Sequence, residues 1–297
     1  MRYFFYLVAF TLFTCYAKAQ GGASADYIKQ LNEWDAGRVA ELKADDGWLN
    51  LVGLYWLDEG KNTFGSGSDN ALVFPAGSID ESAGYFERTG STIKLVTNDT
   101  GVQIDGKPAN NSIIFSIDMQ GVPEISSGSL RWGVIKRDDK IGIRVRDLKS
   151  PAPAAFKGIE RFPANTAWII PAKLDTTANS SGIMITNKIG QTTKQNSPGK
   201  LVFKINNKRY TLDALDEGDN MLIVFGDATN GKTTYPSGRF IEVKKPGTDG
   251  ATVIDFNMAY NPPCAFTDYA TCPLPPSQNK LPVAITAGEK NYGHHHK

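Results

Sequence analysis

Between residues 24 and 44, apolar side chains recur at the spacing of one face of an α-helix. Ser24 or Asp26 can cap the first turn of such a helix with its side-chain oxygen. The pattern predicts one amphipathic helix within the segment 20–46. We expect the face of this helix that carries Trp34 to pack on the first sheet.

From residue 47 onward the apolar segments are short, and Gly, Asn, Asp or Pro separates them about every eight to twelve residues. This pattern is typical of an antiparallel sandwich or barrel, so the fold class is mainly β. Two successive β units follow, an N-terminal unit over 47–170 and a C-terminal unit over 171–293. No long helical pattern interrupts them, which argues against a parallel βαβ sheet. The expected strands are Trp48–Leu57, Ala71–Phe74, Thr92–Thr97, Ser112–Ile117, Gly133–Ile135 and Ile141–Val145, then Trp168–Pro171, Gly182–Thr186, Leu201–Ile205, Met221–Phe225, Phe240–Val243, Thr252–Phe256 and Val283–Ile285.

Two proline-rich stretches interrupt the strand pattern. The stretch from Pro151 to Pro163 separates the two series and is either a domain boundary or a long covered loop. The segment from Asn261 to Asn279 holds five prolines. Because proline cannot donate to a strand ladder, this second segment is expected to be an irregular and rigid loop.

The first nineteen residues have the features of a secretory signal peptide. Arg2 supplies the positive charge, an apolar stretch follows, and Ala17-Lys18-Ala19 is a small-x-small cleavage site. The protein is therefore expected to be exported, periplasmic or extracellular, and to start at Gln20 after cleavage. No later segment reaches the roughly 20 apolar residues that a membrane-spanning helix needs.

Removal of the signal changes both the charge and the cysteine count. Loss of Arg2 and Lys18 leaves 30 basic residues against 31 acidic ones. Nucleic acid is thus an unexpected partner, since its binding needs a strong basic excess on one face. Cys264 and Cys272 remain, and an oxidising compartment favours a disulfide between them. A metal site is the alternative, but two ligands are too few for zinc.

The body of the chain contains no histidine, since all three lie in the tail 294–297. A Ser-His-Asp triad, a Cys-His dyad and the usual zinc cage all need a rigidly placed imidazole, so these classes are excluded and no cofactor is expected. The segment Gly226–Thr233 satisfies the phosphate-loop pattern G-x-x-x-x-G-K-[ST]. However, Thr233 to Gly238 is β-branched and then contains proline and glycine, which predicts a hairpin where a phosphate loop needs a helix.

Acid–base chemistry without histidine falls to carboxylates, tyrosine or lysine. The last third of the chain places carboxylates among aromatic and amide side chains. The candidate catalytic residues are Asp227, Asp255 and Glu289, and the candidate ligand-binding residues are Tyr235, Arg239, Asn257, Tyr260, Asn261 and Asn279. Asp255-Phe256-Asn257 is predicted to be strand, which would place its two polar side chains on one face. For every one of these residues a structural hydrogen bond or ion pair is the alternative role.

A second polar group lies earlier, in Arg144-Val145-Arg146-Asp147, where two guanidinium groups share one face of a strand. Such an array suits recognition of carboxylate or phosphate. It equally suits cross-strand pairing with acidic residues.

Several of these segments together resemble the family called domain of unknown function 1684. They are Arg144–Asp147, Gly231–Arg239, Asp255–Asn257, Asn261–Phe266, Cys272–Pro276, Asn279–Leu281 and Ala287–Lys290. The resemblance spans roughly residues 48–290 and implies no activity. It implies that Tyr235, Arg239, Asp255, Asn257, Cys264, Cys272, Asn279 and Glu289 belong to the signature of that family.

Residues 63–74 and Gly106 are also similar to a forkhead-associated sandwich. Ser66 stands where that family has its phosphate-binding arginine, which speaks against phosphopeptide binding.

Two functional hypotheses follow. The first is a binding module whose C-terminal β unit holds a small polar ligand, such as a carbohydrate, beneath the 261–279 loop. The second is a histidine-free hydrolase that uses Asp255 or Glu289 with Asp227. The first needs a pocket lined by aromatics, and the second needs two carboxylates roughly 5 to 9 Å apart in a cleft.

Overall fold

The computed structural model describes residues 23–178 and 181–293 of the chain. The signal peptide predicted over residues 1–19 and the tail at 294–297 lie outside these residues. The described chain is mostly β, with antiparallel sheets and one long N-terminal helix, which confirms the predicted fold class. None of the described helices has the length and apolar character needed to cross a bilayer.

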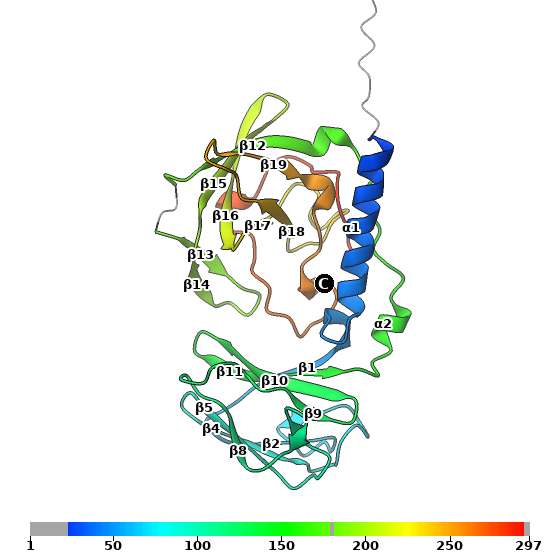
Figure 1. The fold of residues 1–297 in the computed structure, drawn as a ribbon, viewed down its shortest axis with the longest axis vertical. Coiled ribbons are helices and arrows are strands. Elements are labelled where there is room, and N and C mark those ends of the chain that lie inside the picture. The colour runs from blue at the N-terminus through cyan, green and yellow to red at the C-terminus, as the bar shows by residue number, and fades with distance from the viewer. Residues whose placement is uncertain (1–22, 179–180, 294–297) are drawn as a thin grey trace, which may run out of the picture.

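The N-terminal strands form a sandwich of two sheets (Figure 1). One sheet has the order β1-β11-β10-β9-β6-β7 and the other has the order β3-β2-β4-β5-β8. Their facing sides bury an apolar core that includes Phe64, Phe86 and Ile143. The strands are β1 (Leu51–Trp56), β2 (Gly60–Gly65), β3 (Leu72–Val73), β4 (Gly84–Thr89), β5 (Thr92–Thr97), β6 (Gln103–Ile104), β7 (Lys107–Pro108), β8 (Ser112–Phe115), β9 (Ile125–Ser127), β10 (Leu130–Arg137) and β11 (Lys140–Asp147).

The C-terminal strands form one sheet with the order β18-β17-β16-β15-β12-β19, and a separate hairpin joins β13 to β14. The sheet curls until β18 and β19, its two edge strands, contact each other. Its inner face buries a second core around Phe203, Phe225 and Phe256. The strands are β12 (Ile169–Asp175), β13 (Ile183–Thr186), β14 (Thr192–Gln195), β15 (Gly199–Ile205), β16 (Lys208–Glu217), β17 (Asn220–Phe225), β18 (Arg239–Lys244) and β19 (Ala251–Asp255).

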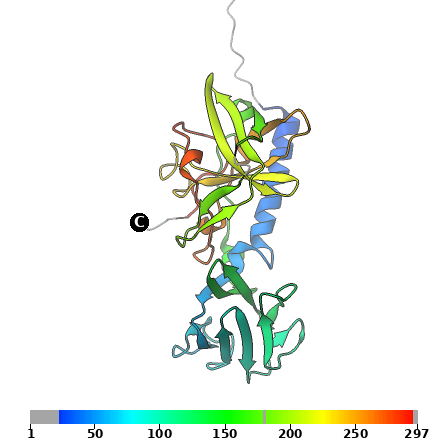
Figure 2. The same cartoon turned by 90° about the vertical axis from the view of Figure 1, so that its left-hand side faces the viewer.

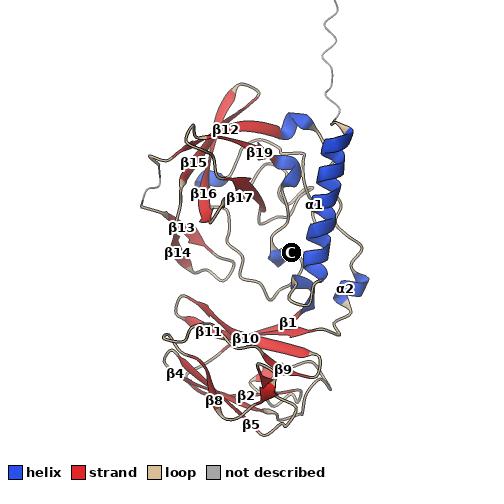
Figure 3. Cartoon of the chain, in the orientation of Figure 1, coloured by secondary structure: helices blue, strands red, loops and turns tan. Residues whose placement is uncertain are grey.

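The remaining elements are helical and, apart from the first, short (Figure 3). They are α1 (Ala25–Lys43) and α2 (Ala152–Ala155), with the 3-10 helices η1 (Trp48–Asn50), η2 (Thr166–Trp168), η3 (Phe256–Met258), η4 (Pro263–Ala265) and η5 (Ser277–Asn279). Helix α1 begins where Ser24 accepts a hydrogen bond from the backbone of Tyr27, so the predicted cap is confirmed.

Helix α1 does not pack on the first sheet, and that expectation is wrong. It runs along the C-terminal sheet, away from the N-terminal sandwich that follows it in sequence (Figures 1 and 2). Its Trp34 ring lies 6.3 Å from the ring of Tyr260, and its Tyr27 hydroxyl donates to Asp255 at 2.7 Å. Both of these partners lie more than 200 residues away in sequence.

Two strand predictions are also wrong, the first in part and the second entirely. Residues Asp255-Phe256-Asn257 are not continuous strand, because β19 ends at Asp255 and η3 begins at Phe256. The Asp255 carboxylate accepts from the Asn257 N–H and so caps this turn, which competes with further strand pairing. Residues 283–285 form no strand. Their extended backbone is instead held by side chains of the neighbouring strand and turn.

The 261–279 segment is irregular apart from η4 and η5, and Asn279 anchors its end. The register of β16 and β17 pairs Leu215 with Leu222, so continuation of the ladder would bring Asp213 opposite Val224. The Asn279 side chain takes that place. It accepts from the Asp213 N–H at 2.7 Å, and it donates to the Asp213 and Val224 carbonyls at 2.9 Å each. The loop thus completes a ladder that the two strands leave open.

Asn279→Ala is expected to lower the free energy of unfolding by about 2 to 4 kcal/mol, because it leaves three buried backbone groups without partners. The measurement is equilibrium unfolding in urea. The control is Gln278→Ala. Gln278 is exposed and donates one hydrogen bond to the Asp213 carboxylate, so its loss should lower the free energy of unfolding much less. Equal losses in the two variants would contradict a ladder-completing role for Asn279.

Candidate functional site

Arg239 and Asp227 form a fully buried ion pair beneath the C-terminal segment. Arg239 Nη2 lies 2.9 Å from Asp227 Oδ2, and neither side chain has exposed surface. The same guanidinium donates to the carbonyls of Ile285, Ala287 and Glu289. Burial lowers the pKa of Arg239, and Asp227 opposes that shift. Desolvated charges of this kind persist only when they are paired, so the pair clamps the C-terminal segment to β18.

Asp227 also organises the turn that carries the phosphate-loop pattern. Its Oδ1 accepts from the backbone and hydroxyl of Thr229, at 2.8 and 2.6 Å, and from the Ile285 N–H. The segment 226–238 consists of turns and isolated bridges with no helix, and Lys232 is exposed. The helix that phosphate binding requires is therefore missing from this segment.

Glu289 is completely buried and joins three segments of the chain. Its Oε1 lies 2.7 Å from Arg38 Nε of α1, and its Oε2 accepts from the Asn261 N–H at 2.6 Å. Burial raises the pKa of Glu289, while Arg38 and the Asn261 bond act against the rise. Asn261 is itself buried and donates to the Lys290 carbonyl. These contacts describe a structural junction between the helix, the loop and the chain end.

Asp255 and Asn257 lie at a different place, below the start of α1. Asp255 Oδ2 accepts from Tyr27, and its Oδ1 accepts from the Asn257 backbone and amide. Asn257 in turn exchanges two hydrogen bonds of 3.0 Å with the backbone of Asn165. Burial and the Asp255 carboxylate raise the pKa of Tyr27, so its hydroxyl remains a donor.

The residues proposed from sequence are therefore only partly brought together. Arg239 contacts Asp227 and the backbone of Glu289, whereas Asp255 belongs to the separate cluster with Asn257. Tyr235 is buried as well, with its hydroxyl donating to the Cys264 carbonyl at 3.0 Å, and burial raises its pKa to about 12. Two hollows in the protein are bordered by residues proposed from sequence. Tyr260 lines the larger hollow, and Asp227 borders the smaller one.

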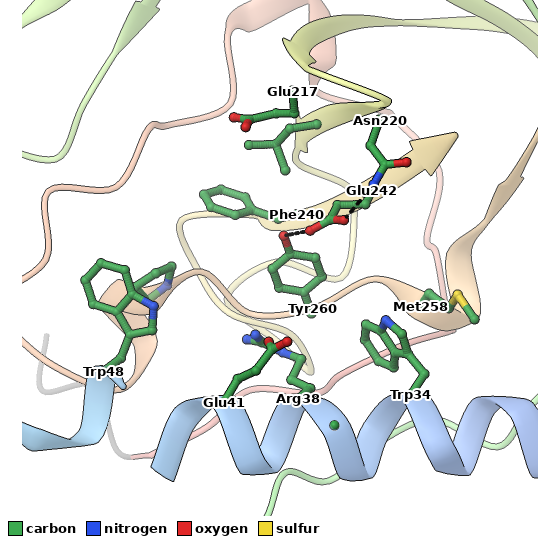
Figure 4. Close-up of a pocket in the computed structure, with 13 residues that line it drawn as sticks. Trp34, Arg38, Glu41, Trp48, Glu217, Asn220, Phe240, Glu242, Met258 and Tyr260 are labelled. Atoms are coloured by element: carbon green, nitrogen blue, oxygen red, sulfur yellow. Dashed lines mark hydrogen bonds between the residues drawn. The ribbon is translucent and has the colours of Figure 1, made fainter. Parts of the chain in front are cut away.

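The larger hollow, which we call the helix–sheet pocket, lies between α1 and the outer face of β17 and β18 (Figure 4). Alternation along β18 turns Ile241 and Val243 into the core, so Phe240 and Glu242 face outward toward the helix. The pocket has a volume of about 830 Å³. Its lining is Trp34, Gly37, Arg38, Glu41, Trp48, Glu217, Asn220, Leu222, Phe240, Glu242, Met258, Tyr260 and Pro263.

Aromatic rings and carboxylates face each other across this pocket. Trp34, Arg38 and Glu41 project from one side of α1, and Glu217 and Asn220 lie across from them (Figure 4). The Tyr260 hydroxyl lies 3.4 Å from Glu242 Oε1. Burial, followed by the charge of Glu242, raises the pKa of Tyr260.

Arg38 is the one cation among the residues that line this pocket, and its guanidinium group already has partners within the protein. It pairs with Glu289, donates to the Asn261 carbonyl at 2.7 Å, and lies 4.3 Å from the centroid of the Tyr260 ring. Glu41, Glu217 and Glu242 remain exposed. The pocket therefore presents acceptors and aromatic faces to a ligand, with an acidic balance.

The smaller hollow lies under the proline-rich loop, between Leu274–Pro276 and the 226–238 turn. It has a volume of about 660 Å³ and a mostly apolar surface. Pro275 packs so close to Gly238 that a Cβ there would fall 2.4 Å from its ring. Asp227 borders this hollow, but its carboxylate oxygens already accept hydrogen bonds from Arg239, Thr229 and Ile285.

Cys264 and Cys272 are buried, unbonded thiols in this structure. Each sulfur accepts from the backbone N–H of the other residue, at 3.1 and 3.3 Å. The hydrogen bond from Cys272 lowers the pKa of Cys264 to about 7, and the same bond, together with burial, raises the pKa of Cys272. The disulfide between them stays a prediction.

No group of three or more His, Cys, Asp or Glu side chains arranged to hold a metal ion occurs within residues 23–178 and 181–293.

One family model matches part of the chain. Residues 154–290 match the model of a family described as protein of unknown function (DUF1684). This part of the chain is similar to that family. The match confirms the resemblance seen in the sequence, although it begins later than the span from residue 48 suggested there. No curated protein matches the chain.

Two solved structures show partial likeness. An uncharacterized protein of Haloarcula marismortui, solved by NMR in solution, is 28% identical over 47% of this chain and 79% of its own, with a TM-score of 0.39. The second is a chain from a structural and functional analysis of phosphothreonine-dependent FHA domain interactions. It is 19% identical over 31% of this chain and 92% of its own, with a TM-score of 0.23. At these TM-scores neither likeness carries an argument about fold or function.

Apart from Tyr260, the residues of the helix–sheet pocket were not proposed from sequence, although two signals pointed to them. Trp34, Arg38 and Glu41 follow the i, i+4, i+7 spacing of one helix face. Phe240 and Glu242 alternate with apolar residues and must face away from the core. Neither signal shows that these two faces meet.

Asp227→Asn is expected to destabilise the fold by about 3 to 5 kcal/mol, because it leaves the Arg239 charge buried without a counterion. Chemical denaturation gives the value. Asp216→Asn is the matched control, since it breaks a pair with Lys245 that is 2.7 Å long but exposed, and it should cost about 0 to 1 kcal/mol. A loss as small as that of the control would show that the buried pair does not clamp the chain end.

In the reduced protein, thiolate absorbance near 240 nm is expected to rise with a midpoint at about pH 7, the pKa of Cys264. Because this pKa lies below the unfolded value of about 8.5, ionisation stabilises the fold fully above that value, and the gain is lost as the pH falls through 7. Cys272→Ala should move the midpoint upward, because it removes the hydrogen bond from the Cys272 thiol. A single midpoint above about 8.5 in the wild-type protein would refute the shared bond.

Proposed function

We propose that the chain binds a small polar molecule rich in hydroxyl groups, with a sugar as the best match, in the helix–sheet pocket. The observation that carries this proposal is the combination of aromatic faces and carboxylate acceptors in one hollow of about 830 Å³. A volume of this size is typical of small-molecule sites, which have apolar walls and few polar groups. The export signal expected at residues 1–19 supports a role outside the cytoplasm.

The chemistry of a sugar fits the two kinds of wall. Flat aromatic rings such as Trp34 and Tyr260 can cover the apolar face of a sugar ring at low entropic cost. Glu242 and Glu217 can accept hydrogen bonds from its hydroxyls, and charged acceptors make stronger bonds than neutral ones. Anionic ligands are disfavoured, because Arg38 is bound to Glu289 and the exposed carboxylates repel them.

Binding has more support than hydrolysis. Each carboxylate proposed for catalysis is already occupied, Asp227 by Arg239, Glu289 by Arg38 and Asp255 by Tyr27. Glu289 has no exposed surface, so a substrate could reach it only after α1 moved away. The general acid and water-accessible base of a glycosidase therefore have no counterpart among these three groups.

The test is isothermal titration of the purified chain with a panel of neutral mono- and oligosaccharides. We expect saturable binding to the wild type, and a loss of roughly tenfold in affinity in Trp34→Ala and in Glu242→Gln, since each removes on the order of 1.4 kcal/mol of contact. Glu242 is exposed, so its amide variant should fold normally.

The matched control is Tyr85→Ala, which removes an aromatic ring from β4 of the N-terminal sandwich, far from the pocket. Its affinity should equal that of the wild type. Absence of binding by the wild type at sugar concentrations on the order of 10 mM, or equal losses in Tyr85→Ala and Trp34→Ala, would reject the proposal.

A further inference from the structure

The outer face of β10 and β11 carries a row of arginines that the helix–sheet pocket does not use. Alternation along β11 buries Ile141, Ile143 and Val145 in the sandwich core, so Arg144 and Arg146 point out of the opposite face. Figure 1 shows β10 and β11 in the layer of the sandwich nearest the C-terminal sheet. The pattern R-V-R thus places two guanidinium groups at the junction of the two β units.

Arg144 is buried without any polar partner. Its exposed fraction is 8%, and it makes no hydrogen bond or ion pair with a described residue. Its Nε and Nη2 atoms are both buried and unsatisfied, as is Nε of Arg146. Its one marked contact is with the ring of Trp48, whose centroid lies 5.5 Å from Cζ.

An arginine in this state is costly, as a comparison within the same chain shows. Arg239 is also buried, but Asp227 and three carbonyls accept hydrogen bonds from both of its Nη atoms, which leaves Nε as its one nitrogen without a partner among the described residues. For Arg144, burial and then the charges of Arg137 and Arg146 lower the pKa to about 10. The thiols of Cys264 and Cys272 oppose this fall in the pKa of Arg144. A buried guanidinium with unused donors points to a missing anion.

A hollow of about 510 Å³ lies beside these groups. Arg131, Arg144 and Arg146 line it, and Gly133 stands directly opposite Arg144 in the β10–β11 register. A Cβ at Gly133 would meet nothing closer than 3.9 Å, so the glycine leaves space in front of the guanidinium. This hollow is named the β10–β11 pocket below.

The acidic residues of the β10–β11 pocket do not neutralise Arg144. Asp45, Asp46 and Glu124 line it, and all three are exposed. Glu124 pairs with Arg131 at 3.4 Å. Asp46 and Glu124 oppose the fall in the pKa of Arg146. Solvent screens exposed carboxylates, whereas the Arg144 charge is desolvated and is therefore the stronger local attractor.

We propose that the β10–β11 pocket binds a small oxyanion, a carboxylate or phosphate group, through Arg144 and Arg146. The guanidinium fork presents parallel N–H donors that match two oxygens of such a group. The anion supplies the acceptors that the buried nitrogens lack. This site is separate from the helix–sheet pocket, whose acidic balance excludes the same ligands.

The test is thermal unfolding of the purified chain in sodium phosphate, sodium sulfate or sodium succinate, with chloride at the same ionic strength as reference. The pH is 6, below the Cys264 pKa of about 7, so that no thiolate competes for Arg144. The wild-type melting temperature should rise with an oxyanion beyond its value in chloride, because a ligand that binds only the folded state stabilises it. A larger rise with succinate assigns a carboxylate ligand, and a larger rise with phosphate or sulfate assigns a tetrahedral one.

Arg144→Met should abolish this specific rise, and titration calorimetry should show a loss of affinity of roughly tenfold or more. Without added oxyanion the variant should melt no lower than the wild type, because it removes an unpaired buried charge. The matched control Arg88→Met removes an arginine that pairs with Glu59 in the opposite sheet and should keep the response.

Any general stabilisation by phosphate or sulfate acts on all three proteins alike, so only the difference between them counts. If Arg144→Met fails to fold, Arg144→Lys keeps the charge but loses the fork, and its response should shrink. Equal oxyanion responses in the wild type and the Arg144 variant would overturn the proposal. So would a wild type that responds to no oxyanion beyond chloride.

Discussion

The buried carboxylate of Glu289 is the contact on which the arrangement of the C-terminal half depends. This carboxylate pairs with Arg38 of the first helix and accepts a hydrogen bond from the Asn261 N–H. The backbone carbonyl of Glu289 accepts a further hydrogen bond from Arg239. A buried carboxylate must be satisfied by charge and hydrogen bonds, and here its partners come from three separate segments. Helix, proline-rich loop and chain end are thereby held in one geometry. The helix–sheet pocket exists because this geometry places Trp34 opposite β18.

The same logic explains why so many polar side chains of this half are structural. Asp227, Arg239, Asn257, Asn261 and Asn279 each complete the hydrogen bonding of buried backbone that no strand pairs. The C-terminal segment and the loop have little regular structure, so their N–H and C=O groups need side-chain partners. These side chains therefore hold the loop and the chain end in place, and the helix–sheet pocket is lined by other residues.

Much of the fold could be predicted from sequence, because alternation and turn residues are local signals. The N-terminal helix, its Ser24 cap and strands such as β11 and β17 follow from them directly. The polar strand β16 was missed, since its first residues are charged and carry weak strand propensity. The pocket could not be predicted. It forms where a helix face meets the outer face of a sheet more than 170 residues further on, and sequence periodicity shows each face but not their contact.

The docking of α1 also constrains the order in which the protein can fold. The helix is made first, but its ion-pair partner Glu289 lies 251 residues later. The N-terminal sandwich, whose strands pair with one another, can form while the rest of the chain is still being synthesised. The aromatic face of the helix stays uncovered until the last strands and the chain end have been synthesised. The surface that Trp34 later shares with β18 accordingly has no packing partner until β18, more than 200 residues later in sequence, has been made.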